Sequence, residues 1–153
     1  CPAMLHAAQQ SRNTRAGFTL VEIMIVVAIV AILSAAAMPA YTRYITRSRI
    51  PEATNVLASW QLKMEQWFLD NQTYYAASGG TCGVNPPSTS SYFTFSCTVS
   101  SKSAYTLYAS GTGAMSGFNY TIDQDGTKTS TLTATGWAGS ASACWITNTG
   151  GTC

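Results

Sequence analysis

Glu22 is the only charged side chain in a long apolar segment, which makes it the first candidate for chemistry in this chain. The segment reads FTLVEIMIVVAIVAILSAAAM and extends from Phe18 to Met38. A carboxylate placed in lipid costs on the order of 3 kcal/mol by insertion scales, so a cation is expected to neutralise it. No Lys, Arg or His occurs between Phe18 and Tyr41. We therefore expect the countercharge to come from a chain terminus or from another molecule.

Catalytic chemistry finds little support elsewhere in the sequence. The only histidine, His6, precedes the apolar segment, and no G-x-S-x-G, phosphate-loop or H-E-x-x-H motif occurs. Asp123 and Asp125 lie close together in the run DQDG, but an EF-hand register would place Lys128 and Ala134 where calcium loops need Gly and Glu. We expect these aspartates to shape a hairpin turn. The chain is thus predicted not to be an enzyme, with no catalytic residue, metal or cofactor.

The cysteines predict disulfide bonds. Cys1 precedes the apolar segment, which leaves four others: Cys82, Cys97, Cys144 and Cys153. No pair has the C-x-x-C spacing typical of zinc sites. Four cysteines permit three pairings. We favour Cys82 with Cys97 and Cys144 with Cys153, because each pair closes a short local loop.

The apolar segment itself predicts a helix over residues 18–41. At about 1.5 Å of rise per residue the stretch from Phe18 to Met38 is roughly 30 Å long, enough to cross the hydrocarbon core of a bilayer. The preceding residues, 1–17, are polar and basic and end in Gly17. Secretory signals are cut after their apolar part. A cut between Gly17 and Phe18 would instead keep the helix and give Phe18 a new, positively charged N-terminus near Glu22.

The run RAGFTLVEIMIVVAIVAIL, within residues 12–41, resembles the class III signal and helix start of type IV pilins and pseudopilins. The resemblance implies that residues 1–17 are a leader, removed after Gly17 by a prepilin peptidase that then methylates Phe18. It also implies that Glu22 pairs with the terminal amine of a neighbouring subunit during assembly. Pro39 matches a family proline that kinks or locally melts the helix.

Beyond Pro39 an amphipathic helix is expected over residues 42–70, which resembles the corresponding helix of small PilE-like minor pilins. Apolar residues at helical spacing predict that one face packs against a sheet: Ala53, Val56, Leu57, Trp60, Met64, Trp67 and Phe68. Pro51 is expected to bend this helix or to begin a new one. Three arginines form a collar, interpreted as solvated or interfacial, with acidic subunit neighbours or nucleic acid as the alternative: Arg43, Arg47 and Arg49.

The rest of the chain predicts a small α+β head. Residues 71–91 are rich in Gly, Pro and Ser and are expected to form a loop. Four segments with alternating apolar and polar residues predict a four-stranded antiparallel sheet within residues 92–133: 92–99, 103–110, 117–123 and 127–133. Residues 134–153 form the C-terminal segment, whose disulfide loop resembles the D-region of type IVa pilins. The fold class expected from the resemblance is the pilin fold.

The function implied by the resemblance is that of a type IV pilus subunit, a minor pilin placed along the filament in pili that serve adhesion, twitching motility or DNA uptake. Its partners would be other pilins in homo- or hetero-oligomers, the prepilin peptidase and the inner-membrane assembly platform. Before assembly the chain would cross the inner membrane with its head in the periplasm, and afterwards it would be extracellular.

Three alternatives remain open: a major pilin, a type II secretion pseudopilin, and a minor pilin that binds DNA during natural transformation. From residue 51 onward three lysines stand against five carboxylates, a net charge of −2 that disfavours DNA as a partner.

Overall fold

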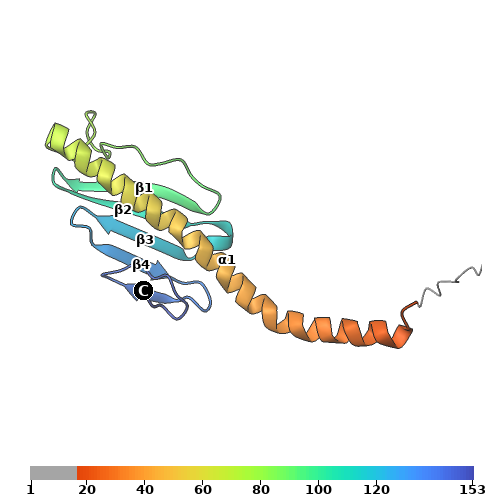
Figure 1. The fold of residues 1–153 in the computed structure, drawn as a ribbon. Coiled ribbons are helices and arrows are strands. Elements are labelled where there is room, and N and C mark those ends of the chain that lie inside the picture. Colours follow the sequence, from red (N-terminus) through yellow and green to blue (C-terminus); the bar gives the residue numbers. More distant parts are fainter. Residues whose placement is uncertain (1–16) are drawn as a thin grey trace, which may run out of the picture. The chain divides into compact units, whose positions relative to one another are not determined.

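The computed structural model describes residues 17–153 and begins with one long helix, α1, Leu20–Asn71 (Figure 1). The chain divides into two compact units, Cys1–Pro39 and Ala40–Cys153. Of the expected leader only Gly17 lies within the described residues. The division into leader, helix, loop, sheet and C-terminal segment as separate functional regions stays a prediction.

The first unit consists, in its described part, of the N-terminal portion of α1. Every side chain from Gly17 to Pro39 is exposed in the isolated chain, including large apolar ones such as Leu20, at 76%. This portion makes α1 long and apolar enough to cross a membrane. Such a surface is stable in water only when something covers it, because apolar area exposed to water is costly at about 25 cal/mol per Å².

In the second unit α1 lies on a sheet, and its buried residues repeat at helical spacing: Ile50, Ala53, Leu57, Trp60 and Met64. Val56 and Phe68 are partly buried against the same core. The expected apolar face is therefore present. The prediction that Pro51 begins a new helix is wrong, because α1 continues through Pro51, as it does through Pro39 without local melting. Each proline lacks one backbone N–H, which weakens a helix without always ending it.

The sheet has five antiparallel strands, in the order β1-β2-β3-β4-β5, and not the four that were predicted. The strands are β1, Phe93–Ser101; β2, Ala104–Gly111; β3, Phe118–Asp123; β4, Lys128–Leu132; and β5, Gly139–Ala141. A 3-10 turn, Gly113–Met115, joins β2 to β3. The missed strand, β5, holds only small residues and has no apolar alternation. Its residues form a strand because they pair with the edge strand β4, with Gly139 opposite Leu132.

Large side chains from the helix-facing side of β2 and β3 fill the core between sheet and helix: Tyr105, Leu107, Phe118, Tyr120 and Ile122. The opposite side of these strands carries mainly hydroxyl and amide groups, which explains the alternation in burial along β2 and β3. The apolar faces of the strands and of α1 therefore pack into one hydrophobic core, which confirms the expected α+β architecture.

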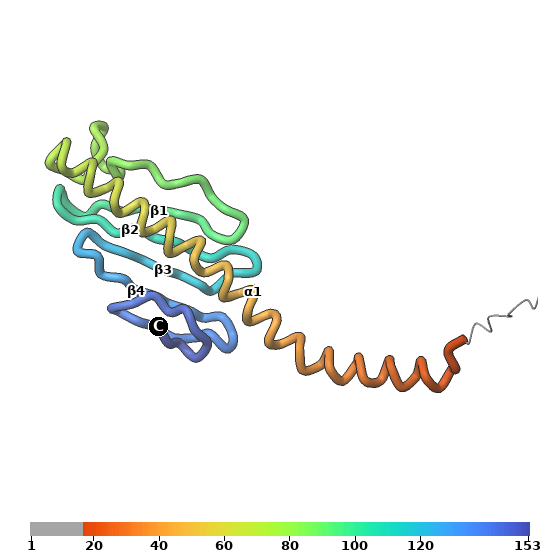
Figure 2. The backbone as a smooth tube through the Cα atoms, in the orientation of Figure 1, coloured from red at the N-terminus to blue at the C-terminus, as the bar shows by residue number. Residues whose placement is uncertain are grey.

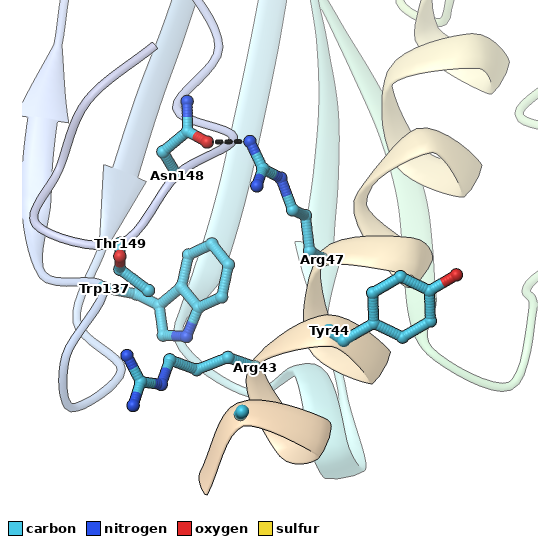
Figure 3. Close-up of a pocket in the computed structure, with 7 residues that line it drawn as sticks. Arg43, Tyr44, Arg47, Trp137, Asn148 and Thr149 are labelled. Atoms are coloured by element: carbon cyan, nitrogen blue, oxygen red, sulfur yellow. Dashed lines mark hydrogen bonds between the residues drawn. The ribbon is translucent and has the colours of Figure 1, made fainter. Parts of the chain in front are cut away.

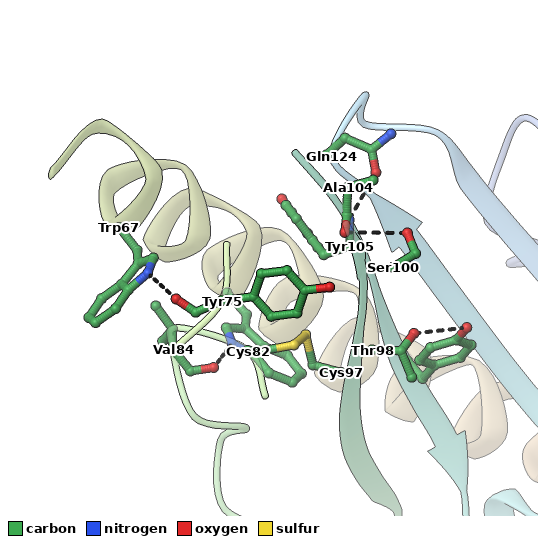
Figure 4. The surroundings of a disulfide bond; sticks show 12 residues. Trp67, Tyr75, Cys82, Val84, Cys97, Thr98, Ser100, Ala104, Tyr105 and Gln124 are labelled. Carbon is green, nitrogen blue, oxygen red and sulfur yellow. Dashed lines mark hydrogen bonds between the residues drawn. A yellow bond between two sulfur atoms is a disulfide. The ribbon is translucent and has the colours of Figure 1, made fainter. Parts of the chain in front are cut away.

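The connection between α1 and β1 runs beside β1 (Figure 2) and is fixed there by the disulfide of Cys82 with Cys97 (Figure 4). Trp67 of α1 supports the same loop through its indole N–H, which donates to the carbonyl of Tyr75 at 3.1 Å. Gly83 lies so close to this indole that a Cβ there would be 2.1 Å from its nitrogen. The close approach of loop and helix therefore requires glycine at this position.

The C-terminal segment is held by a second disulfide, Cys144 with Cys153. These are the two pairs favoured from spacing and from the family resemblance. The buried hydroxyl of Ser130 on β4 donates to the carbonyl of Cys144 and accepts from the N–H of Ile146, both at 2.9 Å. The segment also approaches β5 closely, because a Cβ on Gly139 would lie 2.7 Å from the Cα of Gly151.

Candidate functional site

The start of α1 is closed by a reciprocal pair of side chains. The Glu22 N–H donates to the Thr19 hydroxyl at 3.2 Å, and the Thr19 N–H donates to Glu22 Oε2 at 3.3 Å. This is a capping box, which satisfies two N–H groups that have no partner within the helix. The Glu22 carboxylate also faces the positive end of the helix dipole.

The capping box was missed in the sequence analysis, although the spacing T-x-x-E in FTLVE is its usual signature. It gives Glu22 neutral hydrogen-bond partners within its own chain, while the source of the positive countercharge stays a prediction. Gly17 and Phe18 directly precede the cap, outside the helix, and Phe18 is 80% exposed. The peptide bond between Gly17 and Phe18 is therefore accessible in this structure. The Glu22 carboxylate is directed back toward Thr19, the residue after that bond.

The three arginines of the expected collar do not act as one group. Arg49 lies over the ring of Tyr92, with its guanidinium carbon 4.2 Å from the ring centroid. Arg43 and Arg47 instead line a groove of about 360 Å³ between α1 and the C-terminal segment (Figure 3). The far side of this groove is formed by Trp137, Asn148 and Thr149. We call these five residues the arginine groove.

Asp123 and Asp125 form a turn, as expected. Asp123 Oδ1 accepts from the N–H groups of Asp125 and Thr127, both at 2.9 Å, and Gly126 has a φ of 76°. Asp125 accepts from the side chain of Gln124 at 2.8 Å. Asp123 thereby satisfies backbone donors of the β3–β4 connection, which is the usual role of aspartate in turns. In residues 17–153 no group of three or more His, Cys, Asp or Glu side chains could hold a metal ion.

A cluster of one carboxylate and two phenols was not predicted. Glu65 Oε1 accepts from the hydroxyl of Tyr74 at 3.0 Å and from that of Tyr105 at 2.9 Å. The two tyrosine rings meet edge to face, with centroids 4.5 Å apart. The cluster joins α1, the following loop and β2. Sequence spacing could not indicate it, because Glu65 and Tyr105 are brought together only by the tertiary fold.

This cluster predicts a loss of stability in alkali. Burial, followed by the hydrogen bond and the charge of Glu65, raises the pKa of Tyr74 from 10.0 to about 12. Folding therefore favours the protonated phenol, so its contribution is complete below pH 10 and is lost as the pH rises toward 12. We expect the free energy of unfolding, measured by urea denaturation of the full chain in detergent, to fall across this window. Tyr74→Phe should flatten the fall, and an unchanged profile in this variant would contradict the assignment.

Comparison with protein families gives two matches. Residues 12–38 match the prokaryotic N-terminal methylation motif. Residues 39–119, more than half of the chain, match the family described as type IV minor pilin ComP, DNA uptake sequence receptor. The two matches adjoin at Pro39 and together cover the leader boundary, α1 and the first two strands.

Similar curated proteins include the fimbrial protein EcpC of Eikenella corrodens, 38% identical over 77 residues, which are 48% of this chain and 50% of that protein. The type IV major pilin protein PilE1 of Neisseria gonorrhoeae is 40% identical over 73 residues, 47% of this chain and 44% of that protein. The chain thus spans about half the length of these relatives. Among solved structures, the non-core minor pilin PilV of Neisseria meningitidis has a TM-score of 0.49 at 18% identity, over 59% of this chain and 90% of PilV.

Proposed function

Because the chain belongs to the type IV pilin family, and within it to the minor pilin family of ComP, we propose that it is a structural subunit of a type IV pilus, placed along the filament as a minor pilin. One observation carries the proposal. The apolar portion of α1 is wholly exposed in the isolated chain, begins at Leu20, shortly after Gly17, and carries a single carboxylate, Glu22. A bilayer before assembly and a bundle of neighbouring helices afterwards would each cover this surface.

The maturation that this function requires involves the residues before the cap. We propose that the inner-membrane prepilin peptidase cuts between Gly17 and Phe18 and methylates Phe18. The new amine would lie one residue before Thr19, whose N–H already contacts the Glu22 carboxylate. The same carboxylate would then pair with the amine of a neighbouring subunit when the inner-membrane assembly platform adds the chain to a filament. Pro39, at the boundary of the two units, is proposed to give α1 local freedom during this step.

The proposed processing is tested by mass spectrometry of the chain from purified pili and from the membrane of a strain lacking the peptidase. From pili we expect a chain that begins at Phe18 with one additional methyl group on its amine. From the strain without peptidase we expect the leader to be retained. A filament form that begins at any other residue, or lacks the apolar segment, would contradict the proposal.

A second candidate function is favoured by the description of the matched family as a DNA uptake sequence receptor. For this chain, DNA binding would require basic side chains on the head. Lys63, Lys102 and Lys128 are all exposed, and the ammonium of Lys128 lies over the ring of Trp145 at 4.7 Å. The net charge of −2 from residue 51 onward still weighs against this function. Among the described residues, the other basic side chains precede that stretch: Arg43, Arg47 and Arg49.

A further inference from the structure

The arginine groove combines two positive charges with a rigid wall. Arg43 and Arg47 stand one turn apart on α1, while Trp137, Asn148 and Thr149 come from the segment after β4 (Figure 3). Trp137 is nearly buried, and its ring meets Phe118 of β3 edge to face at 5.5 Å. Trp137 thus joins the wall to the folded core, Asn148 is linked to α1 by its hydrogen bond with Arg47, and Thr149 is exposed.

The chemistry of the groove favours an anion. None of its lining residues carries a carboxylate. Arg47 donates a hydrogen bond to the side-chain oxygen of Asn148, a neutral acceptor that orients the guanidinium without cancelling its charge. The planar N–H groups of arginine match the oxygens of phosphate, and Thr149 adds a hydroxyl at the same site. A volume of about 360 Å³ is larger than one phosphate requires, and it lies within the range of small-molecule sites.

We propose that the arginine groove binds the phosphate of an anionic phospholipid headgroup. The position of the groove in the chain favours a lipid as the source of the phosphate. Ala40, which also lines the groove, lies two residues after the apolar segment ends at Met38. Basic side chains next to a membrane segment are attracted to anionic lipids, by about 1 kcal/mol each, which corresponds to roughly fivefold. The inference rests on the membrane-anchored state within the proposed function, and it does not depend on filament assembly.

The groove can be tested on the full chain in nanodiscs that contain equal amounts of phosphatidylglycerol and phosphatidylcholine. Native mass spectrometry after release from the discs measures which lipid stays bound. We expect at least fivefold enrichment of phosphatidylglycerol on the parent chain. Arg43→Gln with Arg47→Gln should abolish it. Asn148→Ala, which leaves the charge unchanged but frees Arg47, should reduce it.

Arg49→Gln is the matched control, because Arg49 follows Arg47 closely in the sequence but lies over Tyr92, outside the groove. This variant should retain the enrichment, and each variant should keep the thermal transition of the parent. If Arg49→Gln lost as much phosphatidylglycerol enrichment as the double variant, the lipid would be held by general attraction between basic residues and the membrane and not by the groove.

Three further outcomes would overturn the proposal. The first is displacement of the lipid by millimolar inorganic phosphate, which would indicate a site for the free anion. The second is displacement by double-stranded DNA in a manner that depends on Arg43 and Arg47, which would assign the groove to nucleic acid. The third is no enrichment on the parent combined with weaker self-association of the double variant in detergent, which would assign the groove to an acidic group of a second copy. None of these outcomes depends on cleavage after Gly17, so failure here is distinguishable from failure of the proposed function.

Discussion

Replacing Glu22 with alanine is expected to lower incorporation of the chain into filaments by about a hundredfold or more. Removal of one partner from a buried ion pair leaves the other charge uncompensated and typically costs about 3 to 5 kcal/mol. In the assembled filament the uncompensated group would be the amine of Phe18 of a neighbouring subunit. The measurement is the amount of variant and parent chain in sheared pili, relative to the amount in the membrane, by quantitative immunoblot.

The capping box provides the control that separates charge pairing from helix capping. Thr19→Ala removes the hydroxyl that accepts from the Glu22 N–H but keeps the carboxylate. Loss of a cap costs about 1 kcal/mol, so we expect Thr19→Ala to lower incorporation only severalfold. Glu22→Gln, which keeps the shape but not the charge, should resemble Glu22→Ala. If the alanine variant enters pili as efficiently as the parent, the assembly role of Glu22 is wrong. If Thr19→Ala is equally defective, capping explains the effect.

Removing the disulfide of Cys82 with Cys97 is expected to destabilise the second unit by about 3 kcal/mol, or roughly 10 °C in Tm. The bridge spans 15 residues and holds the loop after α1 against β1, where Cys82 is 5% exposed. Without it, the loop would be held by its remaining hydrogen bonds, which include the one from the Gly83 N–H to the carbonyl of Tyr74 at 2.8 Å. Calorimetry of the full chain with Cys82→Ala and Cys97→Ala measures the change.

The second disulfide offers a matched comparison. Cys144 and Cys153 are 9 residues apart, so the loop-entropy relation gives a slightly smaller effect, about 2.5 kcal/mol. The segment keeps other anchors, because Ile146 is fully buried and its carbonyl accepts from the hydroxyl of Tyr120 at 3.0 Å. Reduction of the parent chain should reproduce the combined loss of both double variants. An unchanged Tm after removal of either bridge would show that its loop is already ordered in the unfolded chain or held by other contacts.

Local patterns predicted those parts of the fold that depend on neighbours in sequence. The stripe from Ala53 to Phe68 indicated the buried face of α1, and apolar alternation indicated β1 to β4. The fifth strand could not be predicted in this way, because Gly139, Ser140 and Ala141 carry no pattern and become a strand only beside β4. Pro51 suggested a helix boundary, but packing of Ile50 and Ala53 on the sheet keeps the helix continuous.

The candidate sites differ in the same way, between those with a local sequence pattern and those formed only by the tertiary fold. Gly17, Phe18 and Glu22 could be proposed from the sequence because their pattern is local and specific, and their roles stay predictions. Even the capping box of Thr19 was within reach of sequence reasoning. The arginine groove and the cluster of Glu65 with two tyrosines could not be found, since each depends on residues that are far apart in the chain. Asn148 and Arg47 illustrate this, because their hydrogen bond joins positions 101 residues apart.

The two edge strands of the sheet, β1 and β5, are protected in ways that matter where many copies of the head lie close together. Strands with open backbone groups tend to pair with other chains and aggregate. Here the border at β1 is accompanied by a covalently tied loop, and the border at β5 is only three residues long, with Gly151 packed against Gly139. Many such heads could therefore stand at high local density on one fibre without their sheets fusing edge to edge.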